Sequence, residues 1–461
     1  MDHARCAALH NYLVDYRLAA EGLNLAANRD TFMSRHGAAT SAILPRLHPS
    51  LAAFLAAARI IRFPFLFAHG FPNPGVSNDL VGLIDNGLAD LYSEPEDCLV
   101  RLYLPVIESG GESGGGLIYH QTRHVATFSM NADDADYALP VDEHPMNWHP
   151  LETVLSNWIS LIRLGKVVAS PAPRGLFGSE KIGPWEWRPY GNGQVAACVA
   201  AWDRLCGAIE ARQDAAATPA GMVDDGYHHP GEPLLTPVAL NAANIPDPSF
   251  AREFLNRARR PPRIHRIAPG LSLPPADEPS FAAAQPYAHL LPPGDATQQD
   301  EGVLMPPVYL FFSGAYDAPV DVAGWRSPFR GCLAVDDAEA ARVLPARVPA
   351  GLYTEGVARG RDLECAEEGF RLLLPFAVAG ARRSDGSEVD DDVAGGLFQH
   401  GYKPFGGNYH RPQRLERLLD HWAGLVRRGV WAVGPRGVEG GLEVFRNATG
   451  GGMDYIIPPS W

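Results

Sequence analysis

Residues 194–213 read QVAACVAAWDRLCGAIEARQ, and this stretch decides the fold class. Its apolar side chains recur at i, i+3, i+4, i+7, i+10, i+11 and i+14, the spacing of one face of an α-helix. The residues on that face are Val195, Cys198, Val199, Trp202, Leu205, Cys206 and Ile209. The spacing predicts a core-facing helix over Gln194–Gln213, with both cysteines buried and reduced.

A second helix is predicted over Pro412–Arg428. Proline suits its first turn, the two arginines at its end suit the last turn, and Gly429 suits the stop. Short strands are predicted at 99–107, 117–130, 308–312 and 430–433, and a further helix at 362–374. Helices that alternate with short strands, joined by many Pro- and Gly-rich loops, indicate a mixed α/β fold.

Composition places the chain among soluble globular proteins. Of its 461 residues, 46% are apolar and 20% are charged, which excludes wholesale disorder. The net charge of −14 excludes a surface that is basic throughout, so a nucleic-acid partner requires a local basic patch. Six scattered cysteines, an N-terminus unlike a signal peptide and no charge-free apolar span predict a cytoplasmic protein with no membrane partner.

The domain organisation is predicted from two loop-rich segments, 214–237 and 261–307. The second contains eleven prolines in forty-seven residues. Because proline removes a donor and clashes within helices, regular elements there should not exceed about two turns. We expect a main α/β region over 1–260, a Pro-rich linker or surface wrap over 261–307, and a second α/β lobe over 308–461 that can pack with the first into one domain.

Two histidines and a glutamate can be assembled into a metal-binding group. His120 and His124 fall in the predicted strand 117–130, where residues i and i+4 share a face. With Glu152 they give the two-His-one-carboxylate set of a non-haem iron site. The alternative, which we favour, is that the histidines are separately solvated or hydrogen-bonded, so no metal or other cofactor is predicted.

Three residues are candidate catalytic groups. His149 and Glu152 lie at the predicted start of a helix that follows Pro150, near the positive end of its dipole. A carboxylate there can serve as a general base or a substrate clamp, or it can simply satisfy free N–H groups. Ser129 is a candidate nucleophile in the preceding strand, although no Gly-x-Ser-x-Gly elbow surrounds it.

Candidate substrate-binding residues lie in three segments. Clustered carboxylates after the Ser129 strand suit a guanidinium, and the alternative is a solvated acidic turn. Two Gly- and Pro-bounded loops, 178–190 and 397–414, are rich in aromatic and charged side chains and can line a pocket. The residues concerned are Asp133, Asp134 and Asp136, then Glu180, Trp185 and Glu186, then His400 and Lys403.

The strongest charge signal is the segment 252–266, REFLNRARRPPRIHR. Its six arginines could hold phosphates, or they could belong to an exposed helix face that pairs with acidic neighbours. As candidate tRNA-binding residues they are Arg252, Arg257, Arg259, Arg260, Arg263 and Arg266.

Several segments resemble one family. They are HPLETVLSNWI (149–159), GSEKIGPWEWRPY (178–190), LFQHGYKPFGGNYHRPQRLERLLDHW (397–422) and DYIIPPSW (454–461). They resemble filamentous-fungal proteins linked to secondary-metabolite genes, which we group with the arginine-containing cyclodipeptide synthases. The resemblance covers nearly the whole chain. No catalytic motif of that family is aligned, so every candidate residue above is inferred from this sequence alone.

The resemblance implies a tRNA-dependent synthase of fungal secondary metabolism that joins arginine to a second amino acid as a diketopiperazine. Its partners would be arginyl-tRNA and a second aminoacyl-tRNA, and no cofactor is implied because the aminoacyl ester is already activated. Two alternatives remain open from the residues. One is a metal-dependent oxygenase or hydrolase that uses His120, His124 and Glu152. The other is a non-catalytic protein that binds a small molecule.

Overall fold

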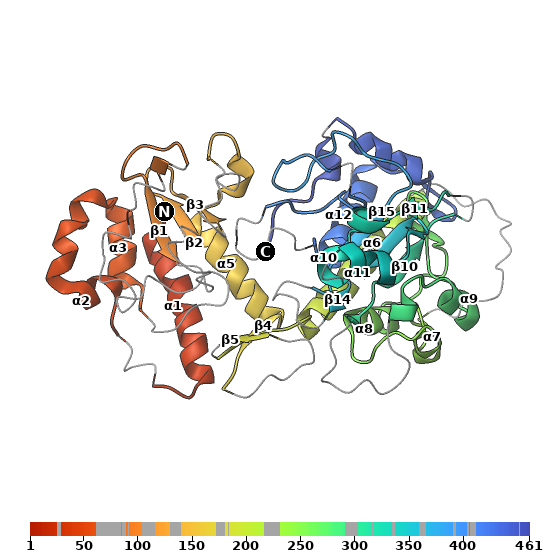
Figure 1. Ribbon diagram of the computed structural model, residues 1–461, viewed down its shortest axis with the longest axis horizontal. Coiled ribbons are helices and arrows are strands. Elements are labelled where there is room, and N and C mark those ends of the chain that lie inside the picture. Colours follow the sequence, from red (N-terminus) through yellow and green to blue (C-terminus); the bar gives the residue numbers. More distant parts are fainter. Residues whose placement is uncertain are drawn as a thin grey trace. The chain divides into compact units, whose positions relative to one another are not determined.

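The computed structural model describes residues 1–24, 29–60, 84, 89–90, 92–103, 116–129, 140–171, 180–182, 184–215, 231–290, 303–314, 317–333, 337–358, 366–390, 393–402, 405, 412–450 and 452–461. The chain forms two compact units. Unit 1 comprises Met1–Arg188, Tyr402–Tyr409 and Pro458–Trp461, and unit 2 comprises Pro189–Gly401 and His410–Ile457. Each unit contains helices and antiparallel strands (Figure 1), so the predicted mixed α/β class is confirmed.

The helices of unit 1 begin at residues that cap them. Asp2 accepts the Arg5 N–H at 3.0 Å at the start of the first helix, and Thr31 forms a capping box with Ser34 at the start of the second. The described helices are α1 (His3–Ala20), α2 (Phe32–His36), α3 (Pro49–Ala57) and α5 (Leu151–Arg163), with 3-10 helices η2 (Gly37–Ala42), η3 (Leu44–Arg46) and η6 (Pro145–Asn147).

Two three-stranded antiparallel sheets complete the described part of unit 1. The first has the order β1 (Leu99–Tyr103), β2 (Gly116–His120), β3 (Val125–Ser129). The prediction of a single strand over 117–130 is wrong, because the chain reverses between β2 and β3 at His124, whose φ is +58°. The second sheet has the order β4 (Val167–Ala169), β6 (Trp185–Trp187), β5 (Glu180–Ile182).

A seven-stranded sheet organises unit 2. Its order is β15 (Phe370–Leu373), β13 (Gly351–Thr354), β10 (Tyr309–Phe312), β8 (Leu271–Ser272), β7 (Arg266–Ala268), β17 (Gly437–Val438) and β16 (Val433–Gly434). Only the β17–β7 pair is parallel. A helix was expected over 362–374, but residues 370–373 pair with β13 along their whole length. Paired strands β11 (Val320–Asp321) with β12 (Arg347–Val348), and β9 (Val303–Met305) with β14 (Val357–Ala358), lie outside this sheet.

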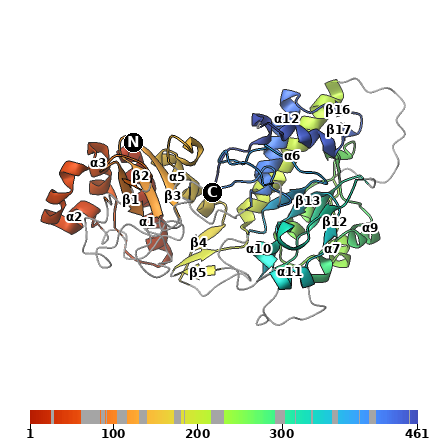
Figure 2. The same cartoon turned by 45° about the horizontal axis from the view of Figure 1, so that its top comes forward.

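The two helices predicted from apolar stripes are both present and lie side by side (Figure 2). They are α6 (Asn192–Ala215) and α12 (Leu415–Arg428), and the latter ends at Gly429 with a φ of +76°. Cys198 and Cys206 are buried free thiols, as predicted. The other described helices of unit 2 are α7 (Pro237–Ala242), α8 (Phe250–Arg257), α9 (Glu278–Ala283), α10 (Arg330–Leu333), α11 (Asp337–Val343), and 3-10 helices η7 (Ala288–Leu290), η8 (Gly324–Arg326), η9 (Leu442–Ala448) and η10 (Met453–Tyr455).

The compact units divide between Arg188 and Pro189, and not at 261–307. The Pro-rich segment belongs to unit 2, because β7 and β8 are central strands of its sheet and Ile267 and Leu271 are buried in its core. Its described elements are short, as the prolines predict, and α9 has six residues. In the part of the chain that the structure describes, no helix has both the length and the apolar character needed to cross a membrane.

Candidate functional site

A depression in unit 1 brings together two of the residues singled out from the sequence, His124 and Glu152. Its volume is about 640 Å³. Helix α5 buries Leu151, Leu155 and Trp158 on one face, and this leaves Glu152 and its helical neighbours to form one wall. The depression is lined by Met1, Asp2, Arg5, His124, Pro150, Glu152, Thr153, Ser156, Asn157 and Ser160.

Glu152 is held in the first turn of α5 by two donors. Its Oε1 accepts the backbone N–H of Asp2 at 2.6 Å. The thiol of Cys6, which is fully buried on α1, also hydrogen-bonds to the carboxylate. Burial, and then the charge of Glu152, raise the pKa of Cys6, so the sulfur keeps its proton and donates it. The carboxylate is therefore fixed in position at the wall of the depression.

His124 is positioned by a tyrosine and a second histidine. Its Nδ1 lies 2.9 Å from the hydroxyl of Tyr119, and its ring packs edge-on against His48 with centroids 4.5 Å apart. Burial is the largest cause that lowers the pKa of His124, the N-terminal ammonium group and His48 lower it further, and the charge of Glu152 acts in the opposite direction. The imidazole is therefore neutral at neutral pH and can accept a proton.

A chain of hydrogen bonds links the ring of His124 to that of His48 through Tyr119 and Ser50. The backbone N–H of Ser50 donates to Nδ1 of His48, which makes that nitrogen an acceptor, and the Ser50 hydroxyl lies 2.9 Å from it. Ser50 also hydrogen-bonds to Tyr119. Neutral His124 accordingly has two tautomers. Nε2 holds the lone pair when Nδ1 donates to the Tyr119 oxygen, and Nε2 holds the proton when Tyr119 donates to Nδ1.

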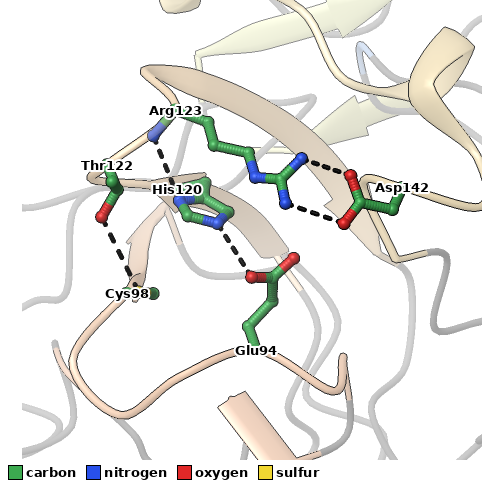
Figure 3. A network of polar contacts seen from close by, with 6 residues as sticks. All are labelled: Glu94, Cys98, His120, Thr122, Arg123 and Asp142. Carbon is green, nitrogen blue, oxygen red and sulfur yellow. Dashed lines mark hydrogen bonds and ion pairs between the residues drawn. The ribbon is translucent and has the colours of Figure 1, made fainter.

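His120 does not join this group. Its buried ring accepts the backbone N–H of Arg123 on Nδ1 at 3.3 Å, so Nε2 carries the proton and donates it to Glu94 at 3.1 Å (Figure 3). Arg123 in turn makes a bidentate pair with Asp142 on the same side of the hairpin (Figure 3). The turn between β2 and β3 separates His120 from His124. Among the described residues, no three His, Cys, Asp or Glu side chains form a group that could hold a metal ion.

The other predicted catalytic residues lie elsewhere or outside the described part. His149 donates from Nε2 to the carbonyl of Met146 at 2.9 Å and packs against Phe405, with ring centroids 4.9 Å apart. Burial lowers the pKa of His149, so the ring is a neutral structural group. Ser129 ends β3, but its side chain is outside the described part, as are residues Asp133, Asp134 and Asp136.

The aromatic segment 178–190 is not a loop over its described residues. Trp185 and Glu186 lie in β6, the middle strand of its sheet, and both are at least 98% buried. Trp185 stacks on Tyr16 with centroids 6.0 Å apart, and Glu186 pairs with Arg188 at 3.4 Å. These side chains therefore belong to the core of unit 1. Glu180 begins β5, and its side chain is outside the described part.

His400 is likewise a core residue, in unit 2. It is 1% exposed, and its Nδ1 lies 3.3 Å from the side-chain amide of Gln413. The backbone N–H of Asp385 donates to the His400 carbonyl at 3.1 Å. Lys403 is outside the described residues.

The arginines of 252–266 divide into buried and exposed groups. Arg260 is 6% exposed and donates to the carbonyls of Leu234 and Pro274, and buried Arg252 bonds to Asn241. These two arginines stabilise unit 2 and are not available to a polyanion. The more accessible ones are half-buried Arg266 at the start of β7 and exposed Arg257, Arg259 and Arg263.

No protein-family model, curated protein or solved structure matches the chain.

Sequence reasoning missed the groups that position His124 and Glu152. Cys6, His48, Ser50 and Tyr119 come from helices α1 and α3 and from strand β2, and none belongs to a local motif. Alternation along a continuous strand would place His124 on the face of His120 and away from Tyr119. The turn between β2 and β3, which the sequence analysis did not predict, is what brings His124 beside Tyr119.

Proposed function

We propose that the chain is an aminoacyl-transferring enzyme, a tRNA-dependent cyclodipeptide synthase that joins arginine to a second amino acid. We place the reaction at the depression in unit 1. The observation that carries this choice is that a neutral imidazole, His124, and a fixed carboxylate, Glu152, line the same depression. The resemblance of the sequence to that family supports the reaction class. The depression supports the choice of His124 and Glu152 as the residues that act in it.

The reaction needs a base and a site for a cation. The amino group of one aminoacyl ester attacks the ester carbonyl of the other, so a C–N bond forms and the C–O bond to the tRNA ribose breaks. The ribose oxygen leaves and takes up a proton. The free amino group of the resulting dipeptidyl ester then attacks its own ester carbonyl and closes the ring. Each attacking ammonium group must first lose a proton.

His124 and Glu152 match these two needs. In the tautomer with the lone pair on Nε2, His124 can accept the proton of the attacking ammonium group and return it to the departing ribose oxygen. Glu152 can pair with an ammonium or guanidinium group and hold it before the attack. A guanidinium clamp at Asp133, Asp134 and Asp136 remains part of the proposal. Ser129 remains the candidate nucleophile of a variant first step: its hydroxyl attacks the first aminoacyl ester, the ribose oxygen leaves with a proton, and the second amino group then displaces the serine oxygen. Contact with tRNA phosphates is assigned to the exposed arginines, Arg257, Arg259 and Arg263.

The test is product formation by the purified chain with arginyl-tRNA and a mixture of other charged tRNAs, followed by mass spectrometry. We expect an arginine-containing diketopiperazine from the wild type. His124→Gln should reduce the rate by roughly 10²–10⁴-fold, the usual contribution of a general base. His289→Gln, at an exposed histidine of unit 2 outside the arginine-rich segment, is the matched control and should keep the wild-type rate.

Two results would contradict different parts of the proposal. If the wild type forms no diketopiperazine, the reaction class is wrong, and a ligand bound without turnover would favour the non-catalytic alternative. If His124→Gln forms product at the wild-type rate, the reaction class stands but the base lies elsewhere. A metal-dependent reaction would instead reveal itself by loss of activity after chelation and recovery with one added metal.

A further inference from the structure

The hydrogen bonds around His124 continue beyond the depression of unit 1. They pass from the His124 ring, which lines the depression, through the hydroxyls of Tyr119 and Ser50 to Nδ1 of His48. Tyr119 is fully buried, His124 and Ser50 are half-buried, and His48 is exposed. This hydrogen-bond chain therefore leads from the depression, through a buried phenol, to a histidine in contact with solvent.

The two ends of the hydrogen-bond chain are held together by Gln121, which is 4% exposed. The backbone N–H of His48 donates to Oε1 of Gln121 at 2.7 Å, and Nε2 of the same side chain donates to two backbone carbonyls. Gln121 lies in the hairpin that also carries Tyr119 and His124, so the start of α3 is fixed to that hairpin. The alignment of the four groups thus depends on more than the hydrogen bonds between them.

Each member of the hydrogen-bond chain can both donate and accept a proton. Nδ1 of His48 accepts the backbone N–H of Ser50 at 3.2 Å, so Nε2 carries the proton of the neutral ring. Burial raises the pKa of Tyr119, so its hydroxyl keeps a proton whichever way it donates. The hydrogen-bond chain therefore has two complete arrangements, in which both hydroxyls donate toward His48 or both donate toward His124.

We propose that this hydrogen-bond chain carries protons between the depression and solvent. When Nε2 of His124 holds the lone pair, a proton that arrives there is matched by the release of the Nδ1 proton to the Tyr119 oxygen. The Tyr119 proton passes to the Ser50 oxygen, the Ser50 proton passes to Nδ1 of His48, and Nε2 of His48 releases one proton to water. Every group ends neutral, and the hydrogen-bond chain is left in its second arrangement.

Such a transfer suits a base that resists charge. Burial lowers the pKa of His124, so an imidazolium is unfavourable there, and the hydrogen-bond chain removes the need to form one. The same steps in reverse supply a proton at Nε2 when the ribose oxygen leaves, and this restores the first arrangement. The use of the protons in catalysis rests on the proposed function. Tyr119, Ser50 and His48 act through His124 and are therefore positioning residues.

Nuclear magnetic resonance of the ring nitrogens tests the hydrogen-bond chain without substrate. When the His48 ring gains a second proton on acidification, its Nδ1 becomes a donor and both hydroxyls must turn toward His124. Nε2 of His124 then carries the ring proton. We expect the ¹⁵N shifts of His124 to record this change of tautomer at the pH at which His48 is protonated. The other charged groups that act on His124 are the N-terminal ammonium group, Glu152 and His120.

Three variants separate proton transfer from a direct effect of charge. Ser50→Ala interrupts the hydrogen-bond chain but leaves the rings of His48 and His124 packed together, so the tautomer change should disappear. Ser50→Thr keeps a hydroxyl and should keep the change. Ser41→Ala removes an exposed hydroxyl of unit 1 that donates to the Ala38 carbonyl, and it is the matched control. The inference is wrong if His124 keeps one tautomer in the wild type, or if its tautomer changes equally in Ser50→Ala.

Product formation tests the same hydrogen-bond chain during turnover. His48→Gln should lower the rate by up to about 10²-fold, the lower end of the range for a lost proton-transfer group. Added imidazole should restore that rate, because it can take the Ser50 proton from the solvent side. Imidazole should not restore Tyr119→Phe, whose gap is buried.

The two experiments fail in different ways. A wild type that shows the tautomer change but forms no diketopiperazine would contradict the proposed function and support the hydrogen-bond chain. Wild-type rates in both His48→Gln and Tyr119→Phe would contradict the inference, because protons would then leave the depression by another route.

Discussion

Replacement of Arg260 by methionine should destabilise unit 2 strongly, whereas replacement of the adjacent, exposed Arg259 should hardly change its stability. The Arg260 guanidinium donates from Nη2 to the carbonyls of Leu234 at 2.7 Å and Pro274 at 2.8 Å. Burial lowers its pKa to about 10, so the group is still a cation at neutral pH. The Arg260→Met side chain keeps most of the volume but removes both donors.

The expected magnitude follows from the acceptors that would be left behind. A buried carbonyl without a partner costs about 1–3 kcal/mol, so two such groups give roughly 2–6 kcal/mol. Removal of the buried cation itself recovers part of this cost, which makes the lower half of that range the expectation. Arg259→Gln is the matched control. Exposed Arg259 donates to the carbonyl of Gly231 at 2.7 Å, where water can replace it, so the change should be within about 0.5 kcal/mol.

Urea unfolding followed by tryptophan fluorescence measures both variants. Buried Trp202 reports on this region, because its indole N–H donates to the carbonyl of Arg259 at 2.8 Å. We expect the urea midpoint of Arg260→Met to fall far below that of the wild type, and the urea midpoint of Arg259→Gln to equal it. Equal midpoints for wild type and Arg260→Met would refute the assignment of Arg260 to the core and would restore it as a candidate phosphate contact.

Two other predictions concern pH and salt. Burial lowers the pKa of His10 from 6.5 to about 4. Between these pH values the residue is protonated in the unfolded chain and neutral in the folded chain. The free energy of unfolding should therefore fall by up to about 3 kcal/mol as the pH drops from 6.5 to 4. Urea titrations at several pH values measure this dependence, and His10→Gln should abolish it. If the same pH dependence persists in His10→Gln, His10 is not its source. If the exposed arginines hold tRNA, then the combined change Arg257→Gln, Arg259→Gln and Arg263→Gln should flatten the slope of log affinity against log salt by roughly 0.7–0.9 per lost contact. Identical slopes would mean that these arginines do not touch phosphates.

Helical periodicity was the feature of the sequence that predicted structure most reliably. The stripes of 194–213 and 412–428 predict α6 and α12 within a few residues, because an apolar face repeated over four or more turns has one stable solution. Polar burial could not be predicted in the same way. Arg259 and Arg260 are adjacent and chemically identical, yet only Arg260 has two carbonyls from distant segments to satisfy it. Similarly, the Trp-Glu-Trp segment of β6 reads as an amphipathic loop, whereas its strand is buried between two others.

The two histidines of the β2–β3 hairpin show why a shared spacing does not give a shared role. His120 has its acceptor nitrogen occupied by a backbone N–H and its other nitrogen committed to Glu94, so neither is free for chemistry. His124 has only Nδ1 committed, to Tyr119. The difference originates in the backbone, since the turn gives His124 a positive φ and points its ring toward α3 and α5 instead of along β2. If the turn were lengthened by one residue, His124 would lose Tyr119 while the His120–Glu94 pair would survive. If this lengthened variant still formed product at the wild-type rate, His124 would not be the base.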